Sequence, residues 1–254
     1  MELRLGLKAR ATKDVDTLFR GTAQDFETAV DQALSEPWGP FVLERTNLER
    51  IAKAPRLIKP YRFAVKLGVR GKTWRRVQVE VSFPEGNIGA LTVPVAAPAV
   101  GYFGVETPDQ VVAIAMDYQV AQKMHAASDP DAPPDVVNER VRDIVDLVLI
   151  STYFYADGAA PASLKSACLD VFDARAAEAI KMGKAPRRWP PTFVSNASWE
   201  RAYPRLAEEV GLVPTLEEAV ALVQEWVAQI DKSEWSSGQE LPPVQLRDGG
   251  EGLG

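Results

Sequence analysis

The chain has 254 residues with 46% apolar side chains, a composition typical of a globular protein with one large domain or two smaller ones. Its net charge of −6 excludes a basic surface over the whole molecule, so any nucleic-acid contact must come from local patches. One cysteine excludes an internal disulfide, and no apolar run is long enough to cross a bilayer, so we expect a cytoplasmic protein without membrane contact.

The first predicted element is a short strand that contains Asp14 and Asp16, separated by Val15. In an extended strand, residues i and i+2 point to the same face, with Cα atoms roughly 6–7 Å apart. Two carboxylates at that spacing can share a Mg²⁺ ion, which prefers carboxylate and phosphate oxygens. The pair alone is a weak signal, because two aspartates in a solvated turn, bonded to their own backbone, form a common alternative.

A helix over Ala23–Leu34 and a β-hairpin over residues 62–83 follow. In the hairpin, two runs of alternating apolar and polar residues flank a turn at Gly71. Period two places Glu80 on the face opposite the valines, together with Lys66 and Arg62. The turn also predicts that Arg62 lies nearly opposite Glu80.

The second half of the chain is predicted to be mostly helical after a strand at Val111–Met116. The helices are expected over Tyr118–Ala127, Val136–Tyr155, Ser163–Ile180, Ser198–Val210 and Thr215–Ile230. Asp117 is the expected N-cap of the first, and Thr215 with Glu218 forms a capping box at the last. We therefore expect a sheet domain over 1–116, a helical domain over 117–232 and a disordered tail over 233–254.

One charge interrupts the apolar run Ile144–Ile150, namely Asp146. An unpaired buried carboxylate costs several kcal/mol, so we expect Lys123 on the preceding helix to be its partner. Such a pair is compatible with a structural or a catalytic role.

Four motifs occur in order between residues 10 and 147. They are Arg-Ala-Thr-Lys-Asp-Val-Asp, Val-Glu-Val-Ser, Ala-Gln-Lys-Met-His-Ala and Asn-Glu-Arg-Val-Arg-Asp-Ile-Val-Asp-Leu. Together they resemble the AbiEii/AbiGii family of nucleotidyltransferase toxins, which includes the MenT toxins. The resemblance implies an α/β (α+β) fold: a DNA polymerase β-type nucleotidyltransferase mixed sheet followed by a mostly helical C-terminal domain.

The resemblance also implies roles for individual residues. Asp14 and Asp16 would hold two Mg²⁺ ions with Glu80 as the third carboxylate. Lys123 would face a phosphate, and Asp146 would orient it. All five are catalytic candidates.

Three further residues are candidates for substrate binding, of which Thr12 and Arg140 are implied by the same resemblance. Thr12 occupies the position of a serine that is a proposed self-modification site in some relatives. Arg140 would contact a nucleotide phosphate, and Lys66 lies on the same face of the hairpin as Glu80. The family has a Gly-Gly-Ser/Thr motif just before the residues that match Met1–Arg4, so we expect the first strand and the Gly-Ser loop of the sheet domain to be missing here.

The implied function is a Mg²⁺-dependent toxin that transfers a nucleoside monophosphate from an NTP to the 3′ end of tRNA and so blocks translation. Its expected partners are an NTP, tRNA and a cognate antitoxin protein. Two alternatives stay open. One is an impaired enzyme that binds RNA or an antitoxin without turnover, and the other is nucleotide or phosphate transfer to a protein, including its own Thr12.

Overall fold

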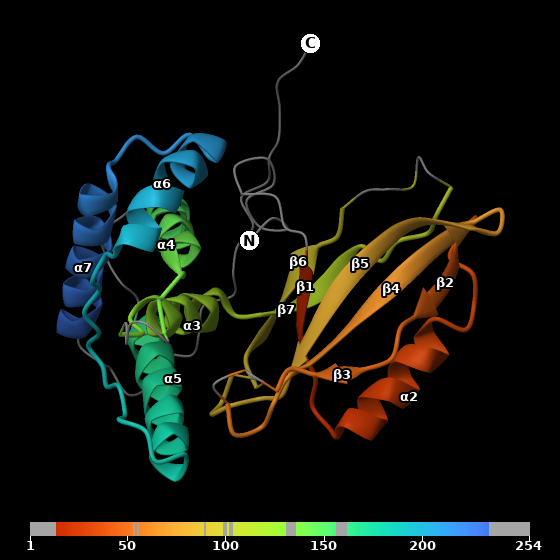
Figure 1. The fold of residues 1–254 in the computed structure, drawn as a ribbon, viewed down its shortest axis with the longest axis horizontal. Helices are drawn as coiled ribbons and strands as arrows, with labels where there is room; N and C mark the ends of the chain where they lie inside the picture. The colour runs from red at the N-terminus through yellow and green to blue at the C-terminus, as the bar shows by residue number, and fades with distance from the viewer. Residues whose placement is uncertain are drawn as a thin grey trace.

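The computed structural model describes residues 14–52, 54, 56–88, 90–98, 101, 104–130, 136–155 and 162–233. Within them a sheet part and a helical part lie side by side (Figure 1). The expected mixed α/β fold, with a mixed sheet followed by helices, is confirmed. The candidate Thr12 and the expected disordered tail beyond Ser233 lie outside the described residues.

The main sheet has the strand order β1-β5-β4-β2, with the short β3 also paired to β4. Its strands are β1 (Asp14–Leu18), β2 (Val42–Arg45), β3 (Glu49–Arg50), β4 (Tyr61–Val69) and β5 (Lys72–Ser82). β1 runs parallel to β5, and the other pairs are antiparallel. A separate antiparallel pair is formed by β6 (Thr92–Ala96) and β7 (Gln110–Ile114).

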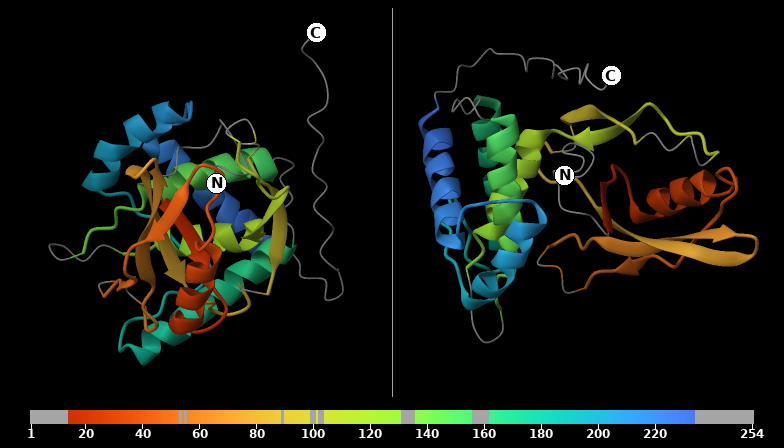
Figure 2. Two further views of the ribbon diagram at one scale, coloured as in Figure 1. Left: turned by 90° about the vertical axis from the view of Figure 1, so that its right-hand side faces the viewer. Right: turned by 90° about the horizontal axis from the view of Figure 1, so that it is seen from above.

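One face of the sheet is covered by α2 (Ala23–Ala33), as Figure 2 shows. The helix is capped at its start by Thr22 and Asp25. The core between helix and sheet contains Phe26, Phe63, Val79 and Val81. Phe26 comes from α2, Phe63 from β4, and Val79 and Val81 from alternate positions of β5, so Glu80 between the two valines points to the opposite face. That opposite face carries the predicted acids.

The helical part is built around α4 (Val141–Phe154), which contacts three of its neighbours. The others are α3 (Met116–Ala127), α5 (Ala162–Lys181), α6 (Ala197–Glu209) and α7 (Leu216–Lys232). The run from Ile144 to Ile150 is buried throughout, as expected for a helix that is apolar on all sides. β7 ends at Ile114 and α3 begins at Met116, so among the described residues the strands precede this point and the helices α3 to α7 follow it.

Two predicted helix starts were wrong. α4 begins at Val141 and not at Val136, because Asn138 binds the carbonyls of Ala127 and Asp129 and accepts a hydrogen bond from the amide of Arg140. These bonds hold the preceding residues in a turn. α3 begins one residue before Asp117 and has no side-chain cap; the carboxylate of Asp117 accepts a hydrogen bond from the Tyr155 hydroxyl instead. The capping box of Thr215 and Glu218 is confirmed.

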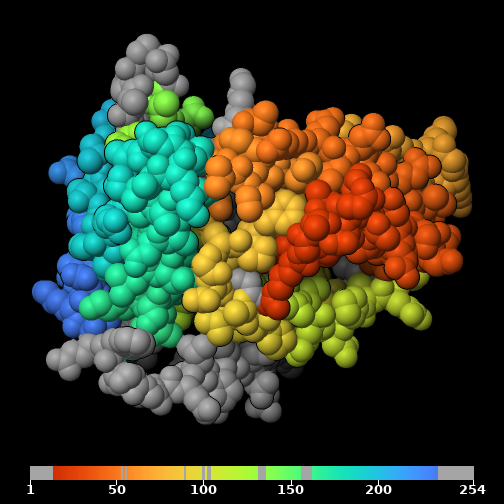
Figure 3. All heavy atoms as spheres, turned by 90° about the horizontal axis from the view of Figure 1, so that it is seen from below, coloured from red at the N-terminus to blue at the C-terminus, as the bar shows by residue number. Residues whose placement is uncertain are grey.

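The two parts are joined by charged side chains, and Figure 3 shows the helical part packed directly against the sheet part. Arg56, in the loop before β4, pairs with Glu85 and with Glu178 of α5, each at 2.8 Å. Arg175 of α5 also pairs with Glu85, at 2.5 Å. These partly buried ion pairs fix α5 against the loop that follows β5. Over the described residues, no helix has the length and apolar character needed to span a membrane.

Candidate active site on the polar face of the sheet

The two aspartates of β1 lie beside the acid of β5. In the parallel pairing, Asp16 lies opposite Glu80 and Asp14 lies opposite Gln78. Paired residues on adjacent strands point to the same face, so all three carboxylates share the face that α2 leaves open. The hydroxyl of Thr17 donates to the carbonyl oxygen of Glu80 at 3.1 Å, which helps to hold this register.

The β4 side of this face carries cations. Arg62 lies opposite Glu80, as predicted, and its guanidinium binds Oε1 of Glu80 at 2.5 and 3.0 Å. Lys66 is on the same face but lies opposite Arg76 on one side and Glu44 on the other. It is four residues from Arg62, or roughly 13 Å along the strand. The structure therefore does not bring Lys66 to the carboxylates.

The electrostatic surroundings of Asp16 link the sheet to the helices. Asp16 keeps solvent access, yet the atoms packed around it raise its pKa, and the charges of Glu80 and Asp14 raise the pKa further. Lys123 of α3 and Arg140 at the start of α4 act in the opposite direction. Five of the predicted site residues therefore share one electrostatic environment, although four separate stretches of sequence supply them.

Lys123 is held between two carboxylates of α4. Its Nζ donates to Oδ1 of Asp143 at 2.9 Å and to Oδ2 of Asp146 at 2.7 Å. Burial alone would lower the pKa of Lys123, but the two carboxylates outweigh it and raise that pKa. Lys123 is therefore a fixed positive charge at neutral pH, and its predicted pairing with Asp146 is confirmed.

Asp143 is a residue of this cluster that the sequence analysis missed. Its side chain is 12% exposed, and its second oxygen lies 3.9 Å from Arg140. Residues three apart lie on one face of a helix, so Arg140, Asp143 and Asp146 form a ladder along α4. This i, i+3, i+6 spacing was the signal that could have identified Asp143.

The three carboxylates fit a divalent ion by the chemistry of their oxygens and by their shared face. Across the described ranges, no three His, Cys, Asp or Glu side chains converge closely enough to form a ready-made metal site. Glu80 is turned toward Arg62, which leaves Asp14 and Asp16 as the adjacent pair. A third ligand from Glu80 requires its side chain to rotate away from Arg62.

The chain is similar to a known protein family and to a solved structure. The model of a family described as "Nucleotidyl transferase AbiEii toxin, Type IV TA system" matches residues 1–228. The solved structure of MenT4, a nucleotidyltransferase toxin from Mycobacterium tuberculosis H37Rv, is similar over 91% of this chain and 72% of that one, with 14% identity and a TM-score of 0.48. No curated protein matches the sequence. Because the family match covers nearly all of its length, the chain belongs to the AbiEii family of nucleotidyl transferase toxins of type IV toxin–antitoxin systems.

Proposed function

We propose that this toxin transfers a nucleoside monophosphate from an NTP to the 3′ end of tRNA in the cytoplasm and thereby blocks translation. Its family provides the general reaction, with an NTP as substrate and an antitoxin as partner. The observation that carries the proposal is the position of Asp16 opposite Glu80 and two residues from Asp14, within the electrostatic reach of Lys123 and Arg140.

The carboxylates of Asp14, Asp16 and Glu80 are the proposed ligands of Mg²⁺. When bound, two such ions stabilise the charge on the attacking and leaving oxygens of an in-line displacement. In that displacement the 3′ hydroxyl oxygen of the acceptor forms a bond to the α-phosphorus, the bond to pyrophosphate breaks, and the hydroxyl proton is released to solvent. Arg62 pairs with Glu80 before the substrates bind, and Glu80 turns away from Arg62 when it becomes the third ligand.

Lys123 and Arg140 are the proposed phosphate contacts. Lys123 carries a compact positive charge at a fixed position, because Asp143 and Asp146 hold its ammonium group by hydrogen bonds and keep it protonated. The side chain of Arg140 is 67% exposed, so it is free to reach a phosphate while staying close to Asp143. Both contribute positive charge where the triphosphate must lie, next to Asp16.

The test is incubation of the full chain with each labelled NTP, Mg²⁺ and total tRNA, followed by separation of RNA from protein. We expect label at the 3′ end of tRNA, dependent on Mg²⁺ and lost in Asp16→Asn. Asp109→Asn is a matched control, since Asp109 is exposed and, among the described residues, contributes its backbone carbonyl and not its side chain to a hydrogen bond. Label on the protein alone would indicate a protein acceptor. Tight tRNA binding without label would indicate an impaired enzyme.

A further inference from the structure

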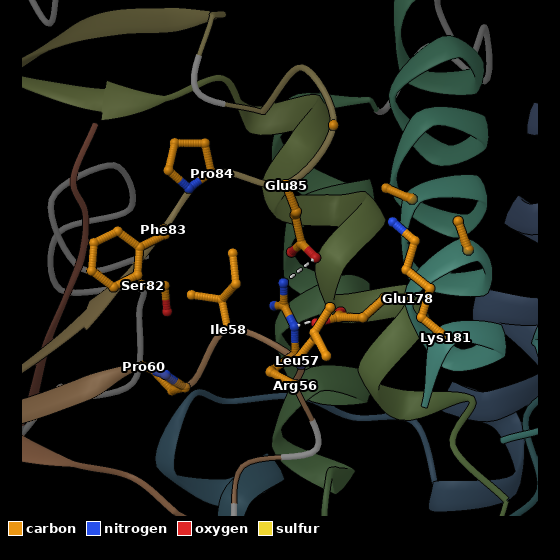
Figure 4. A pocket seen from close by; sticks show the side chains of 13 residues that line it. Arg56, Leu57, Ile58, Pro60, Ser82, Phe83, Pro84, Glu85, Glu178 and Lys181 are labelled. Atoms are coloured by element: carbon orange, nitrogen blue, oxygen red, sulfur yellow. Dashed lines mark hydrogen bonds and ion pairs between the residues drawn. The ribbon is translucent and has the colours of Figure 1, made fainter. Parts of the chain in front are cut away.

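A cavity of about 210 Å³ lies between the end of β5 and α5 (Figure 4). Its apolar wall is formed by Phe83 and Pro84 after β5 and by Ile58 and Pro60 before β4. Glu178 of α5 lies on the opposite side in Figure 4. The cavity is therefore built by three segments that are distant in sequence.

This cavity begins next to the carboxylates of the candidate active site. Ser82, which lines it, is two residues beyond Glu80 on the same face of β5, roughly 7 Å away. Ser82 also lies opposite Leu18, at the end of the strand that carries Asp14 and Asp16. A base bound in the cavity and a hydroxyl group that reacts at the carboxylates would therefore lie within about one nucleotide of each other.

The size and walls of the cavity suit a planar ring. At roughly 30 Å³ per water molecule, its volume corresponds to about seven waters, which is room enough for one base. The ring of Phe83 packs edge-on against Tyr61, with centroids 6.1 Å apart, and this contact fixes the ring in place. Unpaired bases stack on such aromatic side chains in RNA-binding proteins.

The charged groups of the cavity argue against a triphosphate inside it. Arg56 is already paired with Glu85 and Glu178, and Glu178 also accepts a hydrogen bond from the amide of Leu57 at 2.5 Å. Lys181 is the remaining cation of the wall, and within the described residues it has no ion-pair partner. One available cation suits the single phosphate that links two nucleotides of an RNA strand.

We propose that this cavity binds the unpaired base at the 3′ end of the acceptor RNA, with Phe83 as its stacking platform and Lys181 as the contact to the adjoining phosphate. The assignment rests on the proposed function, because it places the acceptor hydroxyl beside Glu80. It adds a reason for the acceptor to be single-stranded at its end: a paired base would first have to give up its partner to enter the cavity.

The experiment measures binding without turnover, by fluorescence anisotropy of a labelled single-stranded RNA of about eight nucleotides. A second RNA is identical but lacks the base of its 3′-terminal nucleotide. The protein variants are Phe83→Ala and Lys181→Gln, with Phe83→Tyr to retain the ring. Phe154→Ala and Lys184→Gln are matched controls, because both side chains are exposed and lie outside the cavity.

We expect the wild type to bind the intact RNA about 5- to 100-fold more tightly than the abasic RNA. Phe83→Ala should bind both RNAs equally and weakly, and Phe83→Tyr should bind them like the wild type. Lys181→Gln should have a lower affinity for both RNAs but keep the preference for the RNA with the terminal base. Where Phe83→Ala fails to fold, the wild-type comparison of the two RNAs remains decisive.

Equal binding of both RNAs by the wild type would overturn the proposal. A raised KM for NTP in Phe83→Ala, with unchanged RNA binding, would also overturn it and assign the cavity to the base of the NTP. The proposed function fails separately: base-dependent RNA binding without transfer of label from any NTP would refute the transfer reaction and retain the cavity.

Discussion

Asp16 and Glu80 lie directly opposite each other in the parallel β1–β5 pair, on the open face of the sheet. Like charges on adjacent strands repel, and the pKa of Asp16 is raised accordingly by burial, by Glu80 and by Asp14. Natural strands rarely retain such repulsion without a function. The arrangement is understandable if a divalent cation occupies the face during the reaction.

Asp16→Asn should reduce nucleotide transfer by at least about 100-fold, because the amide keeps the shape of the side chain but loses the charge that holds a cation. Glu80→Gln should have a similar effect. The measurement is initial rate at saturating Mg²⁺, with circular dichroism to confirm folding. Rates near those of the wild type in either variant would contradict the assignment of these carboxylates.

Asp16→Asn should also stabilise the protein at neutral pH when a chelator is present. The folded-state pKa of Asp16 is raised, so its ionisation disfavours the folded state above the ordinary value of 3.8. Asp16→Asn should therefore have the higher Tm at pH 7, and this advantage should vanish below pH 3.8.

The effect of added Mg²⁺ on Tm provides the control for that melt. Ligands that bind only the folded state raise its Tm, so Mg²⁺ should raise the Tm of the wild type and leave Asp16→Asn nearly unchanged. An equal Mg²⁺ effect on both proteins would place the cation elsewhere.

Lys123→Met should cost about 3–5 kcal/mol in the free energy of unfolding, because it leaves Asp143 and Asp146 without their shared cation. Adding Asp146→Leu should recover only part of that loss, because among the described residues Asp143 then keeps one cation, Arg140, 3.9 Å away. Activity should not return, because the phosphate-facing cation is still absent. Urea melts of the two single variants and the double variant give the coupling energy. Simply additive effects would contradict the cluster.

The pH dependence of this cluster has a defined window. The folded-state pKa of Lys123 lies above its ordinary value of 10.5, so its stabilisation is fully present below pH 10.5 and is lost only as the pH rises through the folded value. Between pH 7 and 10, the difference between Lys123→Met and the wild type should therefore stay constant.

His125 should make the protein sensitive to mild acid. It is 5% exposed, and burial, followed by the charges of Arg187, Arg175 and Arg56, lowers its pKa to about 2. Below about pH 6.5 the unfolded chain binds a proton that the folded chain does not, so stability falls by up to about 1.4 kcal/mol per pH unit.

The measurement compares urea melts of the wild type and His125→Gln at pH 7 and pH 5. Between pH 7 and pH 5, the free energy of unfolding should fall by more in the wild type than in the variant, with a difference of more than about 1 kcal/mol. The slope of this difference is at most about 1.4 kcal/mol per pH unit below pH 6.5. Because His125 is the only histidine of the chain, the NMR spectrum has a single histidine Hε1 resonance, which should not titrate between pH 5 and 8. A resonance that titrates near pH 6.5 would show that the side chain is exposed.

The sequence by itself determined the features that depend on neighbouring residues. Alternation of side chains predicted the hairpin, its turn at Gly71 and the placement of Arg62 opposite Glu80. The lone charge in an apolar run predicted that Asp146 is paired with Lys123. These predictions succeed because period-two and helical patterns, and the cost of a buried charge, act locally or between consecutive helices.

Only the tertiary structure decided which distant segments meet. The parallel pairing of Asp16 with Glu80 joins residues 64 positions apart, and no local pattern fixes such a register. The strands β2, β3 and β6 were missed because short strands gain their stability from the partner strand, and their own residues give little signal: β3 has only charged residues and β6 contains Pro94. The cavity beside Ser82 likewise depends on how α5 packs against the loops around β4 and β5. Packing between remote elements is determined by the fit of whole surfaces, which the order of residues within one element does not reveal.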